Sequence, residues 1–106
     1  MQSIVIVTTT LPYSMPIGQV LEYKNKLIES KLCACAQSNK IKSTYFWDGG
    51  IISEDEWNLS IKTTTNNLED LISLITNTHP YEIPQITHKI ESTTEEYSNW
   101  VSNQVK

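Results

Sequence analysis

The sequence predicts an α+β domain with a ferredoxin-like, split βαββαβ order and an extra helix at the C-terminus. Two observations lead to this fold class. Apolar residues recur at strand spacing and at helix spacing in the order β, α, β, β, α, β, α. An Asp-Gly-Gly sequence separates the two middle strands and marks a tight hairpin. The 106 residues contain no linker or repeat, so we expect a single domain over residues 1–106.

The first two elements are a strand and a helix. Residues 3–10, "SIVIVTTT", form a β-branched apolar run that is typical of a buried strand. Apolar residues then recur at helical spacing, which predicts a helix over about 14–31. Ser14 is its expected N-cap, and Pro16 is tolerated in the first turn.

A long hairpin is expected next. Residues 33–47 predict a strand that carries Tyr45 and Trp47 on one face, and the "DGG" of 48–50 supplies residues that tolerate positive φ. The return strand alternates apolar residues such as Trp57 with polar ones.

The second half predicts a helix, a strand and a final helix. Apolar residues over 68–75 share one helical face, and this helix must end before Pro80. Residues 83–91 predict the last strand. Thr93 with Glu96 is the expected capping box of the final helix.

This order places the two long helices on one face of a four-stranded sheet. The C-terminal helix alone is too short to cover the other face, so we expect an oligomer. Tyr45, Trp47 and Trp57 of the hairpin are the candidates for burial against another subunit.

Composition excludes several classes of function. The net charge is −4 and all eight basic residues are lysines, which disfavours binding of nucleic acid and of phosphate groups. No run of about 20 apolar residues predicts a membrane span, and no signal peptide is visible, so we expect a cytoplasmic protein without membrane insertion. The two cysteines are expected to be free thiols.

Few residues suggest chemistry. Cys33 and Cys35 are soft ligands for Cu(I) or Zn(II), but free cysteines are more often small buried apolar residues. His79 has two interpretations. It is either a metal ligand or proton carrier, or a residue that ends a helix before Pro80, and the sequence pattern favours the helix end. The consecutive acids 54–56 are expected to form an exposed edge. No set of nucleophile, base and acid is recognisable, so we expect no catalysis.

Several segments together resemble the CutA family of divalent-cation tolerance proteins. They are "IVIVTTT" at the start, "LIESKLCACAQ" at 27–37, "TYFWDGGII" at 44–52, "IKTTT" at 61–65, "HPYEIPQI" at 79–86 and "EEYSNWV" at 95–101. The resemblance implies a ferredoxin-like protomer in a homotrimer similar to the PII signalling proteins. It also implies a role in copper or divalent-metal tolerance without catalysis. The expected trimer interface comprises Tyr45, Trp47, Trp57 and Tyr81.

The copper site implied by the resemblance is incomplete in this sequence. Copper-binding members carry a cysteine at the end of the first strand and a His-His pair before Pro-Tyr. Here Thr8 matches the cysteine, and Thr78 precedes His79. His79, Cys35 and Cys33 are the remaining candidate ligands, for weak binding of copper or another divalent cation.

The resemblance also implies a pocket between subunits. Its expected residues are Cys35, Gln37, Trp47, Lys62, Tyr81 and Gln85. Gln85 stands where the family has glutamate, so this pocket loses a negative charge. The alternative function is a PII-like trimeric sensor that binds a small molecule or nucleotide in the clefts between subunits, with the ligand left open.

Overall fold

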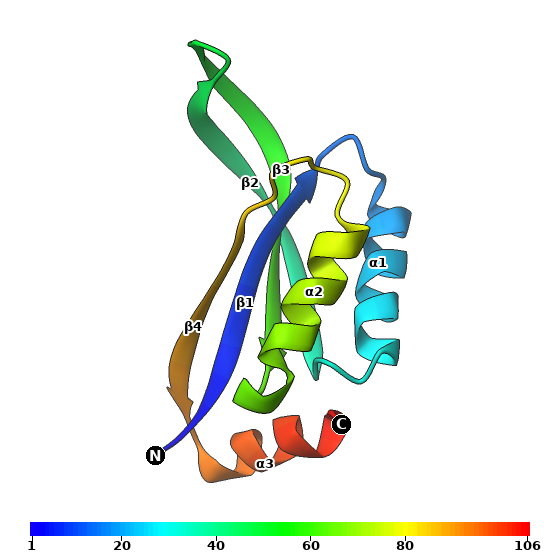
Figure 1. Cartoon of the computed structure of the whole chain (residues 1–106), viewed down its shortest axis with the longest axis vertical. Helices are drawn as coiled ribbons and strands as arrows, with labels where there is room; N and C mark the ends of the chain where they lie inside the picture. The colour runs from blue at the N-terminus through cyan, green and yellow to red at the C-terminus, as the bar shows by residue number, and fades with distance from the viewer.

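The computed structural model describes all 106 residues and confirms the ferredoxin-like fold (Figure 1). Strands and helices follow each other in the predicted order. They are β1 (Gln2–Pro12), α1 (Ile17–Glu29), β2 (Cys35–Trp47), β3 (Gly50–Thr63), the 3₁₀ helix η1 (Thr65–Asn67), α2 (Leu68–Thr78), β4 (Ile86–Thr93) and α3 (Glu95–Gln104). No helix is long and apolar enough to cross a membrane.

The four strands form one antiparallel sheet in the order β2-β3-β1-β4. β2 and β3 are the longest strands, and their hairpin extends beyond the rest of the sheet (Figure 1). The predicted turn is confirmed, because Asp48 and Gly49 both have positive φ angles of 50° and 80° and connect the paired residues Trp47 and Gly50. Two left-handed residues match the twist of a two-residue hairpin.

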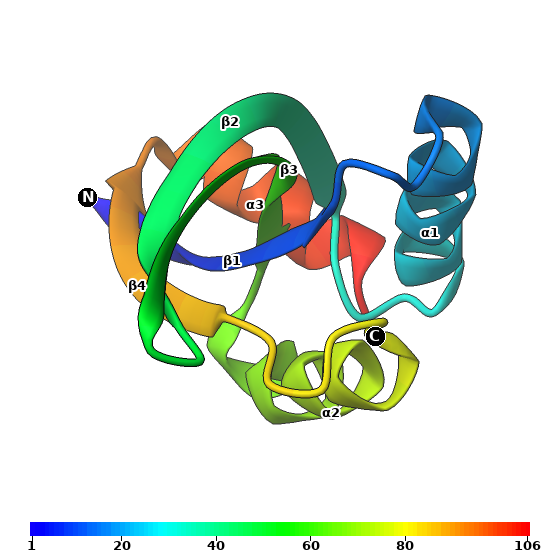
Figure 2. The same cartoon turned by 90° about the horizontal axis from the view of Figure 1, so that it is seen from above.

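One face of the sheet, which we call the helix face, carries the main core. Viewed from above, α1 and α2 lie on the same side of the sheet (Figure 2). Alternate residues of β1 and β3 point toward them, as the period of two requires. The buried residues of this core are Val5, Val7, Leu11, Val20, Leu27, Leu32, Cys33, Leu59, Ile61, Leu71 and Ile75.

The opposite face, which we call the far face, is covered only in part. α3 lies across the end of the sheet near the N-terminus (Figure 1). There Val101 packs with Ile4 and Ile6 of β1 and with Ala34 in a second, smaller core. The half of the far face toward the hairpin has no helix over it, and that half holds the candidate site.

The first predicted helix and the predicted capping box differ from the structure. The helix begins at Ile17 rather than residue 14, because Pro16 is extended and a proline disfavours helical geometry in the residue before it. It ends at Glu29, before Lys31 with its φ of 64°. The N-cap of α3 is Thr94 rather than Thr93, since the Thr94 side chain accepts a hydrogen bond from the Tyr97 amide at 3.2 Å.

Two strands begin later than predicted. β2 begins at Cys35, so Cys33 precedes the strand and is buried in the main core. β4 begins at Ile86 rather than residue 83, because Pro84 has no amide hydrogen to donate to a ladder. The segment 80–85 is therefore a loop, and it passes over the end of the far face.

Candidate functional site

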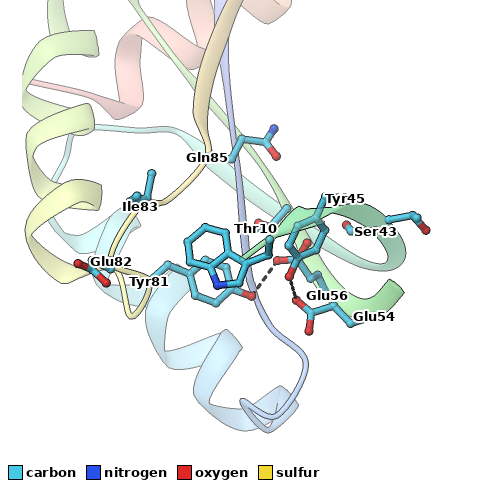
Figure 3. Close-up of a pocket in the computed structure, with 11 residues that line it drawn as sticks. Thr10, Ser43, Tyr45, Glu54, Glu56, Tyr81, Glu82, Ile83 and Gln85 are labelled. Atoms are coloured by element: carbon cyan, nitrogen blue, oxygen red, sulfur yellow. Dashed lines mark hydrogen bonds between the residues drawn. The ribbon is translucent and has the colours of Figure 1, made fainter. Parts of the chain in front are cut away.

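A cleft of about 600 Å³ lies on the uncovered half of the far face. Its walls come from the end of β1, from the hairpin strands β2 and β3, and from the loop 80–85 (Figure 3). The lining residues are Thr10, Ser43, Thr44, Tyr45, Trp47, Glu54, Glu56, Tyr81, Glu82, Ile83 and Gln85. Three of them are carboxylates and none is a lysine or histidine, so the cleft is acidic.

Strand alternation brings two of these carboxylates into the cleft. Glu54 and Glu56 are two residues apart on β3 and share the far face, whereas Asp55 points to the helix face. There Asp55 forms ion pairs with Lys40 and Lys42 at 3.6 and 3.2 Å. The expected exposed acidic edge at 54–56 was therefore wrong for Glu56, which is only 7% exposed.

Each of the two carboxylates accepts a hydrogen bond from a tyrosine (Figure 3). The Tyr81 hydroxyl donates to Glu56 Oε2 at 2.7 Å, and the Tyr45 hydroxyl donates to Glu54 Oε1. The bond to Glu54 raises the pKa of Tyr45 to about 12. Burial and then the bond to Glu56 raise the pKa of Tyr81. Both phenols therefore stay protonated near neutral pH and act as hydrogen-bond donors.

His79 anchors the loop that carries Tyr81. It is the C-cap residue of α2, and its Nε2 lies 2.8 Å from the Thr10 carbonyl and 3.1 Å from Thr9 Oγ1. The Tyr81 amide donates to His79 Nδ1 at 3.0 Å. Because Nδ1 accepts, the proton of the neutral ring is on Nε2, which donates to Thr10. Burial lowers the pKa of His79 and favours this neutral form.

The comparisons with known proteins place this chain in a known family. The model of the CutA1 divalent ion tolerance protein family matches residues 5–104. The chain belongs to this family. It is 36% identical to the divalent-cation tolerance protein CutA of Thermotoga maritima over 102 residues, covering 95% of this chain and 98% of that protein.

Solved CutA structures have the same fold. CutA1 from Pyrococcus horikoshii matches with a TM-score of 0.84 at 28% identity, over 96% of this chain and 98% of that one. The PII-like protein CutA from a Nostoc species matches with a TM-score of 0.85 at 28% identity, over 96% and 97% of the two chains. The fold is thus that of CutA and PII-like proteins, as expected from the resemblance.

The six expected pocket residues separate into two groups. Trp47, Tyr81 and Gln85 line the cleft. The other three, Cys35, Gln37 and Lys62, lie on the same face but toward α3. There Lys62 Nζ donates to the Tyr97 hydroxyl at 3.2 Å.

The three candidate metal ligands are not brought together within one chain. Cys35 pairs with Lys62, beside Ile6 of β1, whereas His79 contacts Thr9 and Thr10 farther along that strand. No group of three or more His, Cys, Asp and Glu side chains is placed to hold a metal ion. Burial, then the nearby Cys35, raise the pKa of Cys33 to about 12, which disfavours the thiolate that binds metals.

The four expected interface residues also differ in position. Tyr45 and Trp47 lie on the far face and are 37% and 53% exposed, and Tyr81 lines the cleft beside them. Trp57 lies on the helix face, where its Nε1–H donates to the Met15 carbonyl at 2.9 Å and its ring packs on Tyr13. Trp57 is thus engaged within its own chain.

Sequence reasoning missed the acidic side of the cleft. Glu54 and Glu56 carry it, and neither was among the expected pocket residues. The signal was present in the sequence, because the turn at 48–49 fixes the register in which residue 54 faces 43 and residue 56 faces 41. Trp47, Tyr45, residue 43 and residue 41 share one face of β2, because they are two residues apart. Their partners on β3 share the same face, and these partners include Glu54 and Glu56.

Proposed function

We propose that this chain is a non-catalytic, homotrimeric protein that binds a cation in the acidic cleft, as part of a role in divalent-cation tolerance. The observation that carries this proposal is the lining of the cleft, in which Glu54, Glu56 and Glu82 are the only charged residues. Carboxylates without nearby lysines attract cations and repel anions. The net charge of −4 acts in the same direction.

The unpaired sheet edges support the homotrimer. β2 and β4 are edge strands, and exposed edges pair readily with other chains. Large apolar side chains are exposed at the hairpin end, where Phe46 and Ile51 are 77% and 70% exposed. Such residues are typical of surfaces that a partner covers. Light scattering on the full chain is expected to give three times the chain mass of 12.1 kDa, and a monomeric mass would contradict the trimer.

The hydrogen bonds of His79 support the absence of catalysis. Both ring nitrogens already bond within the chain, to Thr10 and to the Tyr81 amide. A histidine used for proton transfer needs one nitrogen within reach of a substrate. His79 instead holds the loop 80–85 against β1, which is a structural task.

Copper binding through Cys33, Cys35 and His79 stays a prediction. In one chain these residues lie at different ends of the sheet, so a shared ion would need ligands from different subunits. Titration calorimetry with Cu(I), Cu(II) and Zn(II) tests both metal sites. A cation site in the cleft predicts weaker binding in Glu54→Gln and no change in Cys35→Ala. Weaker binding in Cys35→Ala with no change in Glu54→Gln would instead indicate a metal site at the cysteines.

A PII-like sensor of small molecules is the second candidate, and the volume of the cleft favours it, since small-ligand sites span roughly 300–1,000 Å³. Nucleotides fit poorly, because three carboxylates line the cleft and the chain has no arginine to pair with phosphate. A thermal-shift screen is expected to show no stabilisation by nucleotides, since only ligands of the native state raise the melting temperature.

A further inference from the structure

The volume of the cleft suits a ligand larger than a single metal ion. Its volume of about 600 Å³ lies within the range of sites for small organic ligands. Aromatic rings line the cleft as well as carboxylates, and Figure 3 places Glu82 apart from Glu54 and Glu56. The two carboxylates on β3 therefore act together, and Glu82 does not complete an ion cage with them.

Glu56 is a buried carboxylate without a positive partner. It is 7% exposed, and its one hydrogen-bonded oxygen, Oε2, accepts from the neutral Tyr81 hydroxyl. Both ion pairs of the chain belong to Asp55, on the other face of the sheet. The other oxygen, Oε1, has no hydrogen-bond partner within the chain, so a positively charged ligand in the cleft can pair with it.

Aromatic side chains supply the rest of the wall. Tyr45, Trp47 and Tyr81 line the cleft together with the carboxylates. The faces of aromatic rings attract organic cations, and protein sites for ammonium groups combine such rings with carboxylates. Each phenol that donates its hydrogen to a carboxylate also keeps its oxygen lone pairs, which can accept a hydrogen bond from an ammonium group.

The spacing of the two carboxylates indicates a ligand with two charges. Glu54 and Glu56 are two residues apart on an extended strand, so their Cα atoms are separated by about 6.7 Å. Each carboxylate has its own tyrosine, which gives two half-sites of the same composition side by side, one buried at Glu56 and one exposed at Glu54 (Figure 3). The geometry points to a short aliphatic diamine as the ligand, with one ammonium group at Glu56 and Tyr81 and the other at Glu54 and Tyr45. This inference rests on the proposed cation-binding function and names the class of cation.

A divalent metal ion fits these half-sites less well. Calcium takes six to eight oxygen ligands, and magnesium also needs a complete octahedral shell. The chain places no group of three acidic, histidine or cysteine side chains around one point. An organic dication instead bonds to each carboxylate through a different ammonium group, so its ligands need not surround one point. Two carboxylates that are two residues apart on a strand are therefore sufficient to bind it.

Titration calorimetry on the full chain with putrescine as the probe tests the inference. At about pH 7.5 aliphatic amines carry their charge, and low salt avoids screening. We expect saturable binding of putrescine, with affinity about tenfold or more higher than for butylamine, which has one ammonium group. Glu54→Gln and Glu56→Gln are each expected to weaken putrescine binding about tenfold or more. Glu69→Gln removes the same charge from the exposed surface of α2 and is expected to leave the affinity unchanged.

The outcomes separate this inference from the proposed function. If Zn(II) or Cu(II) binds in a Glu54-dependent manner and putrescine gives no heat, cation binding stands and the diamine is wrong. If neither metals nor putrescine bind, both proposals are wrong. Equal affinities for butylamine and putrescine, or for wild type and Glu54→Gln, would also overturn the diamine. Circular dichroism checks the folding of Glu56→Gln, and Glu54→Gln decides the question if that buried variant is unfolded.

Discussion

The two halves of the far face differ sharply although they lie on the same strands. Toward the N-terminal end of β1, Ile4 and Ile6 are buried under Val101 of α3. Toward the hairpin, Thr10 takes their place on β1 and lines the cleft together with Glu56 of β3. The strand period of two decides which face a side chain joins. The length of the far face that α3 covers decides where that face is apolar. Only the covered end can bury apolar side chains within a single chain.

The two halves also differ in charge. Lys62 lies at the covered end, where its ammonium group bonds to the Tyr97 hydroxyl and lies 5.3 Å from the centre of that ring. Glu54 and Glu56 lie at the open end without a cation nearby. The covered end of the face thus carries a cation and the open end carries two anions, which makes the open end the better place for a cationic ligand or partner.

The largest expected effect is at the covered end. Val101 is fully buried against Ile4 and Ile6, so Val101→Ala removes apolar contacts and leaves a cavity. We expect a loss of about 2 kcal/mol in the free energy of unfolding, measured by urea denaturation at fixed protein concentration. The cation affinity of the cleft is expected to stay the same.

Ser102→Ala is the matched control for Val101→Ala. It changes the neighbouring, exposed residue of α3 and should alter stability by less than about 0.5 kcal/mol. Equal losses of unfolding free energy in both variants would contradict this prediction. They would mean that the packing of Val101 on the far face does not stabilise the protein.

A smaller effect is expected at the open end, where two tyrosines permit the same change in different surroundings. Tyr81→Phe removes the only hydrogen bond of a buried carboxylate, Glu56. We expect a loss of about 1.5 kcal/mol, at the lower end of the range for bonds to charged groups because Tyr81 is half-buried. Tyr45→Phe removes the bond to the exposed Glu54, and we expect little change in stability. Urea denaturation of both variants measures the difference, and a reversed order would refute it.

The sequence predicted the fold better than the cleft, for physical reasons. Apolar periodicity and the Asp-Gly turn determine the elements and the hairpin, because both act between neighbours in the chain. The contact of Tyr81 with Glu56 joins residues far apart in sequence, and it depends on how the loop 80–85 passes over the sheet. The same is true of His79, whose partner Thr10 is 69 residues away. No local pattern marks such contacts.

The smallest expected effect is a pH dependence that comes from His79, the residue that holds this loop. Burial lowers its pKa below the ordinary value of 6.5, so the unfolded chain binds more protons than the folded one just below that pH. The contribution to stability is therefore complete above about pH 6.5 and decreases as the pH falls, by at most about 1.4 kcal/mol per pH unit. His79→Asn should lower stability near pH 7.5 and flatten the decrease toward about pH 5.5 relative to wild type. His88→Asn removes an exposed histidine and is the matched control. Urea denaturation across this pH range measures both slopes, and a His79→Asn slope as steep as that of wild type would show that the neutral ring does not hold the loop in place.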